Sequence, residues 1–411
     1  MTEYTENVEN NNSFWSTKPV IQINKIVATT SKICDLDKIS LYNSKTPISI
    51  PQLKWESIDM EDFCKLSQVC DFLNLYYDKE ESSKFSYFFT PDILQFFVQN
   101  GECLVLQFEN NILGTVSYTK QNLVMNNKNE DFINVNFLCI HPKYRNNGTQ
   151  KMVHLLIDEV TRNCVNKQYN FGIFSTNKKV AKPISVIRYY NRPLNYNKLH
   201  KHDFISIDTD NNTNNLHNRF LENVDPSDYY IKITSQDLKN NNYVDEIHKL
   251  YIEYMSRYNL YVNYSIDELE KILFNDNVNV YILKNKKNKI VDFISYFNYT
   301  KAIKDSDEQL NISHLFLYTC LSEDIQLLIS NFIRLVSKNN NTDLVTITDN
   351  MQNSEALLSE LKPFDVDSDN DDYEKVYDYK FGKSPNKSYI NLFNWQCPQM
   401  KPNQICFQSI F

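Results

Sequence analysis

Residues 136–148 carry the residue types and the spacing best suited to bind an anion. The pattern predicts a strand that ends at Ile140 and a helix that begins near Thr149, so a short loop joins them. A loop in this position presents backbone N–H groups to a ligand, and the dipole of the following helix favours negative charge. Basic side chains lie on the loop or beside it: Lys143, Arg145 and Lys151. We therefore expect phosphate groups to bind here.

The pattern Arg-x-x-Gly-x-Gln over residues 145–150 resembles the pyrophosphate loop of the GNAT-type acyl-CoA transferases. Those proteins have Gly or Ala where Gln150 stands in this chain. The placement of the loop after a strand and before a helix supports the resemblance. The equivalent junction in the second half, residues 320–324, carries two acidic residues and no basic residue. The resemblance therefore implies that only the first half holds the phosphates of CoA.

The loop lies inside a run of elements that alternates between strand and helix periodicity. The sequence predicts a hairpin of residues 103–108 and 112–118 around Asn110-Asn111, a strand over 132–140, a helix over 149–165 and a strand over 170–175. The second half repeats this order, with a hairpin of 280–284 and 290–297, a strand over 312–320, a helix over 324–337 and a strand over 344–348. The repetition indicates an internal duplication, although the two sequences are not alike.

Four more helices follow from caps and apolar spacing. They begin after Asp59, at Thr90-Pro91, at Tyr243 and at the Ser265–Glu268 capping box. We expect an α/β (α+β) fold of two GNAT-like halves related by a pseudo-two-fold duplication, with a mixed central sheet flanked by helices. The division along the chain is 1–207, a polar linker at 208–225, and 226–411.

Motifs along almost the whole chain resemble those of a narrower family, the N-myristoyltransferases. Residues 136–141, Asn-Phe-Leu-Cys-Ile-His, resemble that family's Asn-Phe-Leu-Cys-Val-His. Further matches occur in the family's order at residues 14–20, 85–91, 182–183, 188–195, 292–297 and 394–398. Several separate motifs in one order rarely arise by chance, and the chain is identified as a member of this family.

The resemblance implies an enzyme that transfers a tetradecanoyl group from CoA to the α-amine of an N-terminal glycine. The family holds the acyl carbonyl oxygen with two consecutive backbone N–H groups, which here belong to Phe137 and Leu138, because charge develops on that oxygen. It implies the C-terminal carboxylate of Phe411 as the base. A free α-carboxyl and an α-ammonium group differ by about 4 pKa units, so desolvation has to bring them together. Asn136 and Ser175 fall where the family holds the glycine amine.

The resemblance also implies two sets of binding residues. Myristoyl-CoA, the acyl donor, is expected to contact Phe14, Trp15, Phe137, Leu138, Cys139, Ile140, Lys143, Arg145, Gly148, Thr149, Gln150, Lys151, Met152 and Val153. The acceptor peptide is expected to contact Glu80, Glu81, Phe85, Tyr87, Phe89 and Asn191. Most departures from the family's pattern fall on the peptide side. Thr176-Asn177 replaces Ala-Gly, Asn191 replaces a histidine, and residues 382–386 lose a carboxylate and two glycines.

Composition limits the classes of partner. A net charge of -8 and a sequence pI near 5.5 argue against nucleic acid. The nine cysteines and seven histidines show no metal-ligand spacing, so we expect no metal and reduced thiols in a cytoplasmic protein. No apolar run reaches the length of a membrane span, and no signal peptide fits the polar first residues. N-terminal glycine peptides are the expected partners of a monomer.

The residues alone leave other interpretations open. Phe137 and Leu138 equally suit the core of a buried strand, and the apolar tail over 405–411 equally suits simple packing. Glu80 and Glu81 equally suit a solvated surface. A different amine acceptor or acyl length would fit the same scaffold. A non-catalytic protein that binds acyl-CoA or a peptide is the alternative from another class.

Overall fold

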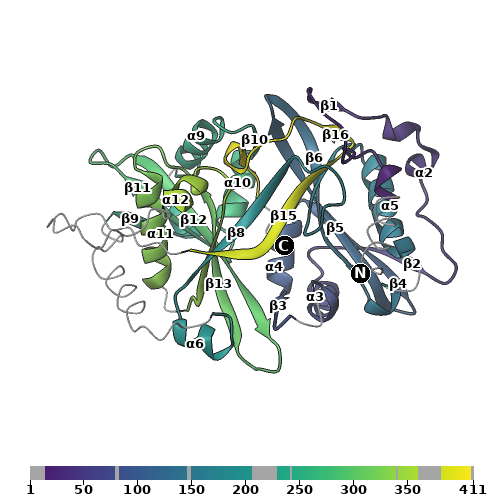
Figure 1. Ribbon diagram of the computed structural model, residues 1–411, viewed down its shortest axis with the longest axis horizontal. Coiled ribbons are helices and arrows are strands. Elements are labelled where there is room, and N and C mark those ends of the chain that lie inside the picture. Colours follow the sequence, from purple (N-terminus) through teal and green to yellow (C-terminus); the bar gives the residue numbers. More distant parts are fainter. Residues whose placement is uncertain are drawn as a thin grey trace.

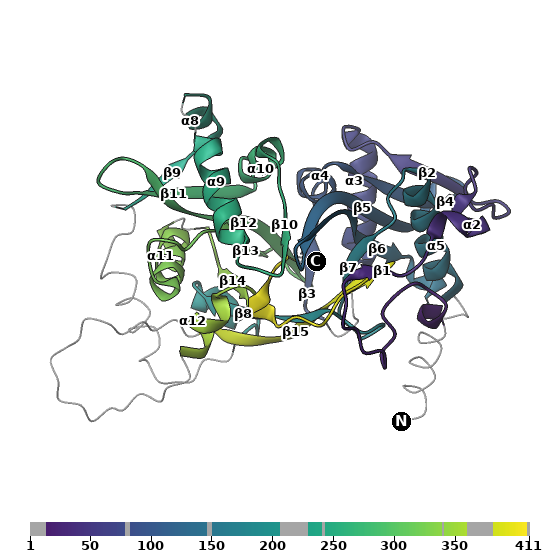
Figure 2. The ribbon, with the colours of Figure 1, turned by 90° about the horizontal axis from the view of Figure 1, so that it is seen from above.

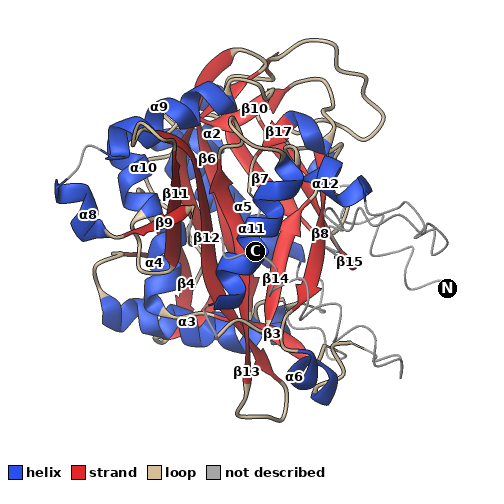
Figure 3. Ribbon diagram, turned by 90° about the vertical axis from the view of Figure 1, so that its left-hand side faces the viewer, coloured by secondary structure: helices blue, strands red, loops and turns tan. Residues whose placement is uncertain are grey.

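The structure is a computed structural model, and it describes residues 14–78, 83–145, 150–205, 229–240, 243–338, 341–359 and 381–408. Its strands form one large mixed sheet with helices on both sides, and a separate two-stranded sheet of β1 (Ser31–Lys32) and β16 (Trp395–Gln396) (Figure 1). Figure 3 shows the layers, with α9 (Tyr243–Met255) and α10 (Ile266–Leu273) on one side of the sheet and α11 (Ile325–Lys338) on the other. The predicted mixed α/β architecture is confirmed.

The first unit consists of a three-stranded antiparallel ladder followed by a helical crossover. Its elements are β4 (Gly101–Phe108), β5 (Asn111–Met125), β6 (Lys128–Ile140), α5 (Gln150–Asn166) and β7 (Gly172–Thr176). β4 pairs with β5 and β5 with β6 in antiparallel fashion, and β7 lies parallel to β6.

Two hairpin details of the sequence prediction were wrong. The turn between β4 and β5 is formed by Glu109 and Asn110, with φ of 47° and 67°, and not by Asn110-Asn111. Residues 119–131, which lie between two predicted strands, continue the ladder to a second turn at Asn126-Asn127. Cross-strand polar pairs stabilise this extension, because Asp131 contacts Lys120 at 2.9 Å and Asn122 at 2.8 Å. A hydrophobic period does not reveal such a hairpin.

The second unit repeats the first one pairing by pairing. Its elements are β11 (Val278–Lys284), β12 (Ile290–Ile303), β13 (Gln309–Tyr318), α11 and β14 (Leu344–Thr348). β11, β12 and β13 are antiparallel neighbours, and β14 lies parallel to β13 after the helical crossover. The predicted recurrence of hairpin, strand, helix and strand is therefore confirmed.

The two units are joined by one strand exchanged in each direction. β8 (Ser185–Pro193) follows β7 in the chain and pairs with β14 of the second unit. β15 (Gly382–Phe393) follows the second unit and pairs with β7 of the first. β8 and β15 also pair with each other, which makes the sheet continuous. Figure 2 shows the two units side by side, with β8 and β15 running beneath both.

The caps read from the sequence are largely correct. Thr90 caps α4 (Pro91–Val98) through the N–H of Ile93, and Ser265 with Glu268 forms a complete capping box at α10. The cap predicted at Asp59 is wrong, because Asp62 accepts from the Lys65 N–H at the start of α3 (Phe63–Tyr76). The helix begins at Phe63, so the nearer aspartate has the required spacing.

The remaining described elements are short. They are β2 (Lys54–Ile58), β3 (Phe85–Phe88), α2 (Ser40–Asn43), α6 (Tyr196–Lys201), β9 (Tyr230–Ile233), α8 (Ser235–Asn240), β10 (Leu260–Val262), α12 (Asn353–Ser359), β17 (Ile405–Cys406) and the 3₁₀ turns Leu36–Lys38, Pro142–Tyr144 and Pro402–Gln404. β3 pairs with β12, so the N-terminal half contributes an edge strand to the second unit. The largest buried cluster runs through α3, α4, α9, α11 and β11 to β14.

Candidate active site

The ladder between β5 and β6 is interrupted by a shift in register. Thr115 pairs with Cys139 and Ser117 with Asn136, so Phe137 and Leu138 together stand opposite a single residue. Phe137 has φ of 51°, a left-handed value that is costly for an aromatic residue. A bulge of this kind re-aims the backbone next to a functional site.

Hydroxyl groups and packing hold the bulge in one shape. The Thr115 hydroxyl donates to the Phe137 carbonyl at 2.9 Å, and the Ser117 hydroxyl donates to the Asn136 carbonyl at 3.1 Å. The Phe137 ring is buried and packs edge-on against Phe89, with ring centroids 5.5 Å apart. The peptide units at 136–138 are therefore fixed before any ligand binds.

The bulge lies where β6 and β7 separate. The two strands pair only from Ile133 to Val135 on β6, and beyond that point both line a cavity of about 910 Å³. The wall beside α5 and the first part of the split is apolar, with Ile133, Val135, Ile157, Val160, Cys164 and Phe171. The other end is polar and draws on β3, β8, β12 and β14, with Tyr87, Asn191, Lys301 and Thr346. We name this space the large cavity.

Several of the residues expected to contact the acyl donor line the large cavity. They are Trp15, Phe137, Leu138, Cys139, Ile140, Arg145 and Val153. Phe14 lies behind this wall, buried and stacked on His154 with ring centroids 3.7 Å apart, while Trp15 stacks on Phe174 at 5.3 Å. Lys143 is exposed and Met152 packs against the apolar cluster beneath α5, so neither forms part of the described cavity wall.

Arg145 has a structural role at the loop after β6. Its Nε donates to the Ile140 carbonyl at 2.8 Å, and its terminal nitrogen donates to the carbonyl of Tyr76. The guanidinium group therefore ties the loop to the end of α3, with donors left over for an anion. Gly148 and Thr149 lie outside the described residues, as do the side chains of Gln150 and Lys151. The backbone of α5 begins at Gln150, so a helix N-terminus follows the loop as predicted.

Of the residues expected to contact the acceptor peptide, some line the large cavity and others do not. Tyr87 and Asn191 line the large cavity, and the Asn191 amide oxygen accepts from the Thr346 hydroxyl at 2.9 Å. Phe85 packs edge-on against Phe204, and Phe89 is buried against Phe137, so both lie outside the cavity wall. Glu80 and Glu81 lie outside the described residues. Asn136 and Ser175, expected at the glycine amine, line the cavity from β6 and β7.

The C-terminal tail, described to residue 408, lies on the other side of the same bulge. β17 lies parallel to β10, which in turn pairs with β5. Beyond β17, Asn350 donates to the Phe407 carbonyl at 3.2 Å and the Gln408 side chain donates to the Phe316 carbonyl at 3.0 Å. Residues 406–408 line a smaller pocket of about 90 Å³ together with Asn136 and Phe137. We name this space the tail pocket.

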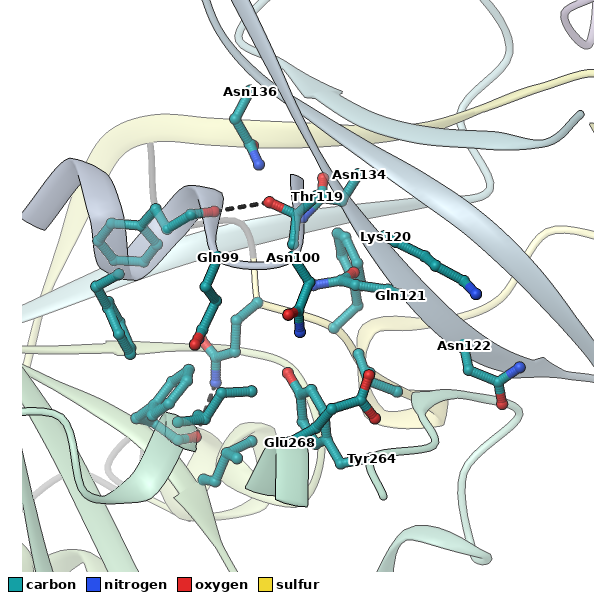
Figure 4. Close-up of a pocket in the computed structure, with 18 of the residues that line it drawn as sticks. Gln99, Asn100, Thr119, Lys120, Gln121, Asn122, Asn134, Asn136, Tyr264 and Glu268 are labelled. Carbon is teal, nitrogen blue, oxygen red and sulfur yellow. Dashed lines mark hydrogen bonds between the residues drawn. The ribbon is translucent and has the colours of Figure 1, made fainter. Parts of the chain in front are cut away.

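Figure 4 shows the tail pocket, with Asn134 and Asn136 from β6 and Thr119 and Gln121 from β5 facing Tyr264 and Glu268. Asn136 and Phe137 form a wall common to the tail pocket and the large cavity. The tail therefore lies on one side of the bulge, and the large cavity lies on the other side. Phe411, expected as the base, lies outside the described residues.

The second unit has the same bulge, but a side chain closes it. Ser295 stands opposite Phe316 and Leu317, accepts from the Leu317 N–H at 3.0 Å and donates to the Leu317 carbonyl at 2.7 Å. The loop that follows β13 is also filled from within, because Asp292 accepts from the N–H groups of Leu321 and Ser322, each at 2.8 Å. An internal carboxylate therefore occupies the amides that an anion would need. This supports assigning the phosphates to the first unit.

Sequence reasoning missed several residues at the polar end of the large cavity. Tyr299, Lys301 and Thr346 belong to β12 and β14, far along the chain from the first unit. One signal was present for Lys301: a lysine near the end of a strand otherwise rich in aromatic and branched residues. Its position depends on the pairing of β12 with β3, which local sequence does not encode.

Within the part of the chain that the structure describes, no helix is long and apolar enough to cross a membrane. The same residues contain no group of three or more His, Cys, Asp or Glu side chains that would suit a metal ion.

Known proteins with the same arrangement are N-myristoyltransferases. Residues 35–187 match the model of the myristoyl-CoA:protein N-myristoyltransferase N-terminal domain, and residues 231–408 match that of its C-terminal domain. The chain is 27% identical to a probable glycylpeptide N-tetradecanoyltransferase of Caenorhabditis elegans, over 95% of this chain and 84% of that protein. It is 23% identical to the glycylpeptide N-tetradecanoyltransferase of Drosophila melanogaster, over 96% and 80% of the two chains.

The fold agrees with these sequence matches. The structure of Saccharomyces cerevisiae N-myristoyltransferase with bound myristoyl-CoA has a TM-score of 0.79 to this chain, at 19% identity, and the match covers 95% of this chain and 94% of that one. The two family models together span most of the chain and both structural units. This chain belongs to the myristoyl-CoA:protein N-myristoyltransferase family.

Proposed function

We propose that this chain is a glycylpeptide N-tetradecanoyltransferase, which moves a tetradecanoyl group from myristoyl-CoA to the α-amine of an N-terminal glycine. The bulge at Phe137 and Leu138 carries the proposal, because it lies between the large cavity and the tail pocket. The first unit would hold the acyl donor. The polar end, to which the second unit contributes, would hold the peptide.

The residues present fit the acyl donor. The apolar wall of the large cavity suits an acyl chain, and the loop before α5 suits the CoA phosphates. In the reaction the glycine nitrogen forms a bond to the thioester carbon, the carbon–sulfur bond breaks, and CoA leaves with a proton. The backbone N–H groups of Phe137 and Leu138 would stabilise the charge on the carbonyl oxygen.

The chemistry of Cys139 favours direct attack by the amine. This thiol lines the large cavity beside the bulge, but burial raises its pKa to about 12. A thiol in that state is a poor nucleophile, so an acyl-cysteine intermediate is disfavoured. Asn136 of β6 and Ser175 of β7 line the large cavity and would bind the glycine amine.

The proton of the glycine ammonium needs an acceptor, and we assign it to the C-terminal carboxylate of Phe411. Supporting this, residues 406–408 bring the tail to the wall formed by Asn136 and Phe137. The alternatives are a different amine acceptor or acyl length, and a protein that binds acyl-CoA without turnover. A cytoplasmic location and a monomeric state stay predictions.

Mass spectrometry of a glycine-initiated peptide incubated with the protein and tetradecanoyl-CoA tests the transfer. The expected result is a mass gain of one tetradecanoyl group at the N-terminus. The matched control is the same peptide with its glycine amine acetylated, which should gain nothing. Saturable CoA binding without any mass gain would contradict the proposed transfer and support a protein that binds acyl-CoA without turnover.

Adding one alanine after Phe411 tests the base. The extension moves the carboxylate by one residue, so kcat should fall by about 100-fold or more if general-base catalysis is lost. The affinity for tetradecanoyl-CoA should not change, because the donor-binding residues are untouched. Full kcat in the extended chain would show that another group takes the proton.

A further inference from the structure

The described charged side chains that line the large cavity are mostly cationic. Asp78 supplies the one carboxylate among them, against Arg145, Lys178, Lys301 and Lys387. Arg145 belongs to the loop after β6 and is tied to backbone carbonyls there. The three lysines come from the segment after β7, from β12 and from β15. The polar end of the cavity is therefore suited to a ligand that brings negative charge.

Lys301 is the most enclosed of these cations. It pairs with Tyr87 across the contact between β12 and β3, and its Nζ lies 4.5 Å from the centroid of the Tyr87 ring. Burial lowers the pKa of Lys301, while the charge of Asp78 raises it. Among the described residues, no carboxylate lies within 4.0 Å of its Nζ. A carboxylate on a ligand would stabilise an enclosed ammonium group that has no paired carboxylate among the described residues.

The position of Lys301 favours the acceptor peptide over the phosphates of CoA as the source of that charge. Its strand partner in the cavity wall is Tyr87 of β3, whose ring centroid lies 5.9 Å from that of Tyr299 on β12. The phosphate loop lies at the end of β6 in the first unit. Residues 382–386, at the start of β15, also lack the carboxylate expected from the family's pattern, and Lys387 follows them.

We propose that Lys301 is a specificity residue, which selects acceptor peptides with an aspartate or glutamate within the first residues after the glycine. This inference rests on the proposed function and deepens it. The peptide carboxylate would pair with the Lys301 ammonium group, and the Tyr87 ring would hold that group in place. Glu80 and Glu81 lie outside the described residues, so the proposal makes no use of them.

The experiment uses a glycine-initiated peptide of alanine and serine, with Asp, Asn or Lys placed at each of positions 2 to 7 in turn. In the unmodified protein, Asp at one of these positions should lower KM relative to Asn by about 10-fold or more, as for a hydrogen bond to a charged group. Lys301→Met should remove this difference in KM between the Asp and Asn peptides. Lys301→Glu should reverse the preference, so that Lys becomes better than Asp at the same position.

The matched control is Lys286→Met, which removes a lysine from the exposed turn between β11 and β12 of the same hairpin. It should keep the preference for Asp. Turnover of the neutral peptide by each variant shows that the variant folds.

The outcomes separate this inference from the proposed function. No turnover of the neutral peptide by the unmodified protein would sink both. Turnover of the neutral peptide without any advantage for Asp overturns the inference alone. A loss of kcat for the neutral peptide in Lys301→Met, or a higher KM for tetradecanoyl-CoA, would mean that Lys301 serves the transfer step or donor binding, and would also overturn it.

Discussion

At the scale of single residues, the site depends on backbone held by side-chain hydroxyls. The bulge at Phe137 carries a left-handed φ of 51°, and such strain persists only when neighbours enforce it. Thr115 does so from β5, fully buried, through its bond to the Phe137 carbonyl. The donors proposed for the carbonyl oxygen are thus positioned by a residue that does not touch it.

Thr115→Val tests this positioning role. Valine keeps the shape of threonine but leaves the Phe137 carbonyl without its donor, which costs about 1 kcal/mol of stability. We expect kcat to fall by about 10-fold with KM for the peptide little changed, as measured by steady-state kinetics. Ser117→Ala, which removes the bond to the Asn136 carbonyl instead, is the comparison. Equal kcat in Thr115→Val and the unmodified protein would show that packing alone fixes the bulge.

The sequence indicated which residues gather at the site but not how they are held. The matched motifs placed Asn136, Phe137, Leu138 and Ser175 in one region, and all four line the large cavity. No local pattern predicts a positive φ at a phenylalanine in a strand. Lys301 and Tyr87 are more than 200 residues apart in the chain, so their contact follows from sheet pairing alone.

At the scale of elements, the second unit shows how a binding loop can be closed from within. The Asp292 carboxylate takes the Leu321 and Ser322 amides, and nearby Glu323 accepts from the Tyr230 hydroxyl. Burial raises the pKa of Glu323 to about 7. This loop therefore carries a proton in the folded state that the unfolded chain releases at lower pH.

The raised pKa of Glu323 makes the folded chain less stable as the pH rises. In the unfolded chain the Glu323 carboxyl has its ordinary pKa, near 4.5. Its contribution to the free energy of unfolding is therefore fully present below pH 4.5, falls as the pH rises toward 7, and is absent above 7. Glu323→Gln keeps an acceptor for Tyr230 and removes the titration. The free energy of unfolding at pH 8 should rise by about 2 kcal/mol, after allowance for partial exposure, with little change at pH 4.

Urea unfolding at pH 4, 6 and 8 measures this effect. Ser306→Ala, at an exposed serine between β12 and β13, is the control; neither side chain titrates in this range, so any change in stability should be equal at all three values. A constant difference between Glu323→Gln and the unmodified protein across pH would contradict the assignment of the proton to Glu323.

The sequence predicted element types well, and the errors have physical causes. Caps and apolar periodicity located α4, α10 and both crossover helices, because these signals are local. The hydrophobic pattern did not predict the extension of β5 and β6, because polar pairs such as Lys120 with Asp131 stabilise it. The exchange of β8 and β15 was also beyond local signals, since each strand pairs with a distant unit.

At the scale of the whole molecule, the exchanged strands make the two units interdependent. A fragment of residues 1–207 would keep β8 but lack β15, the partner of β7. A fragment of residues 226–411 would keep β15 but lack β8, the partner of β14. Each fragment would expose an open strand edge where the sheet is continuous in the intact chain.

Separate and joint production of these fragments tests the interdependence. We expect neither fragment alone to show the cooperative thermal transition of the intact chain, measured by circular dichroism, because each lacks a strand of its own sheet. Produced together, they should restore acyl transfer to the glycine peptide. An intact chain with residues 208–225 replaced by a Gly/Ser linker of equal length is the control. Independent cooperative folding of either fragment would argue against a shared sheet.

The exchange of β8 and β15 also has a consequence for synthesis on the ribosome. β7 emerges roughly 200 residues before β15, the strand that covers its edge. Throughout that interval the first unit has β4 to β7 but an uncovered edge at β7, a state that invites wrong pairing with other chains. The nascent chain should therefore need protection by chaperones until β15 has been made and can pair with β7. Ribosome profiling of chaperone-bound nascent chains would show contact that begins after residue 176 and ends once β15 has left the exit tunnel.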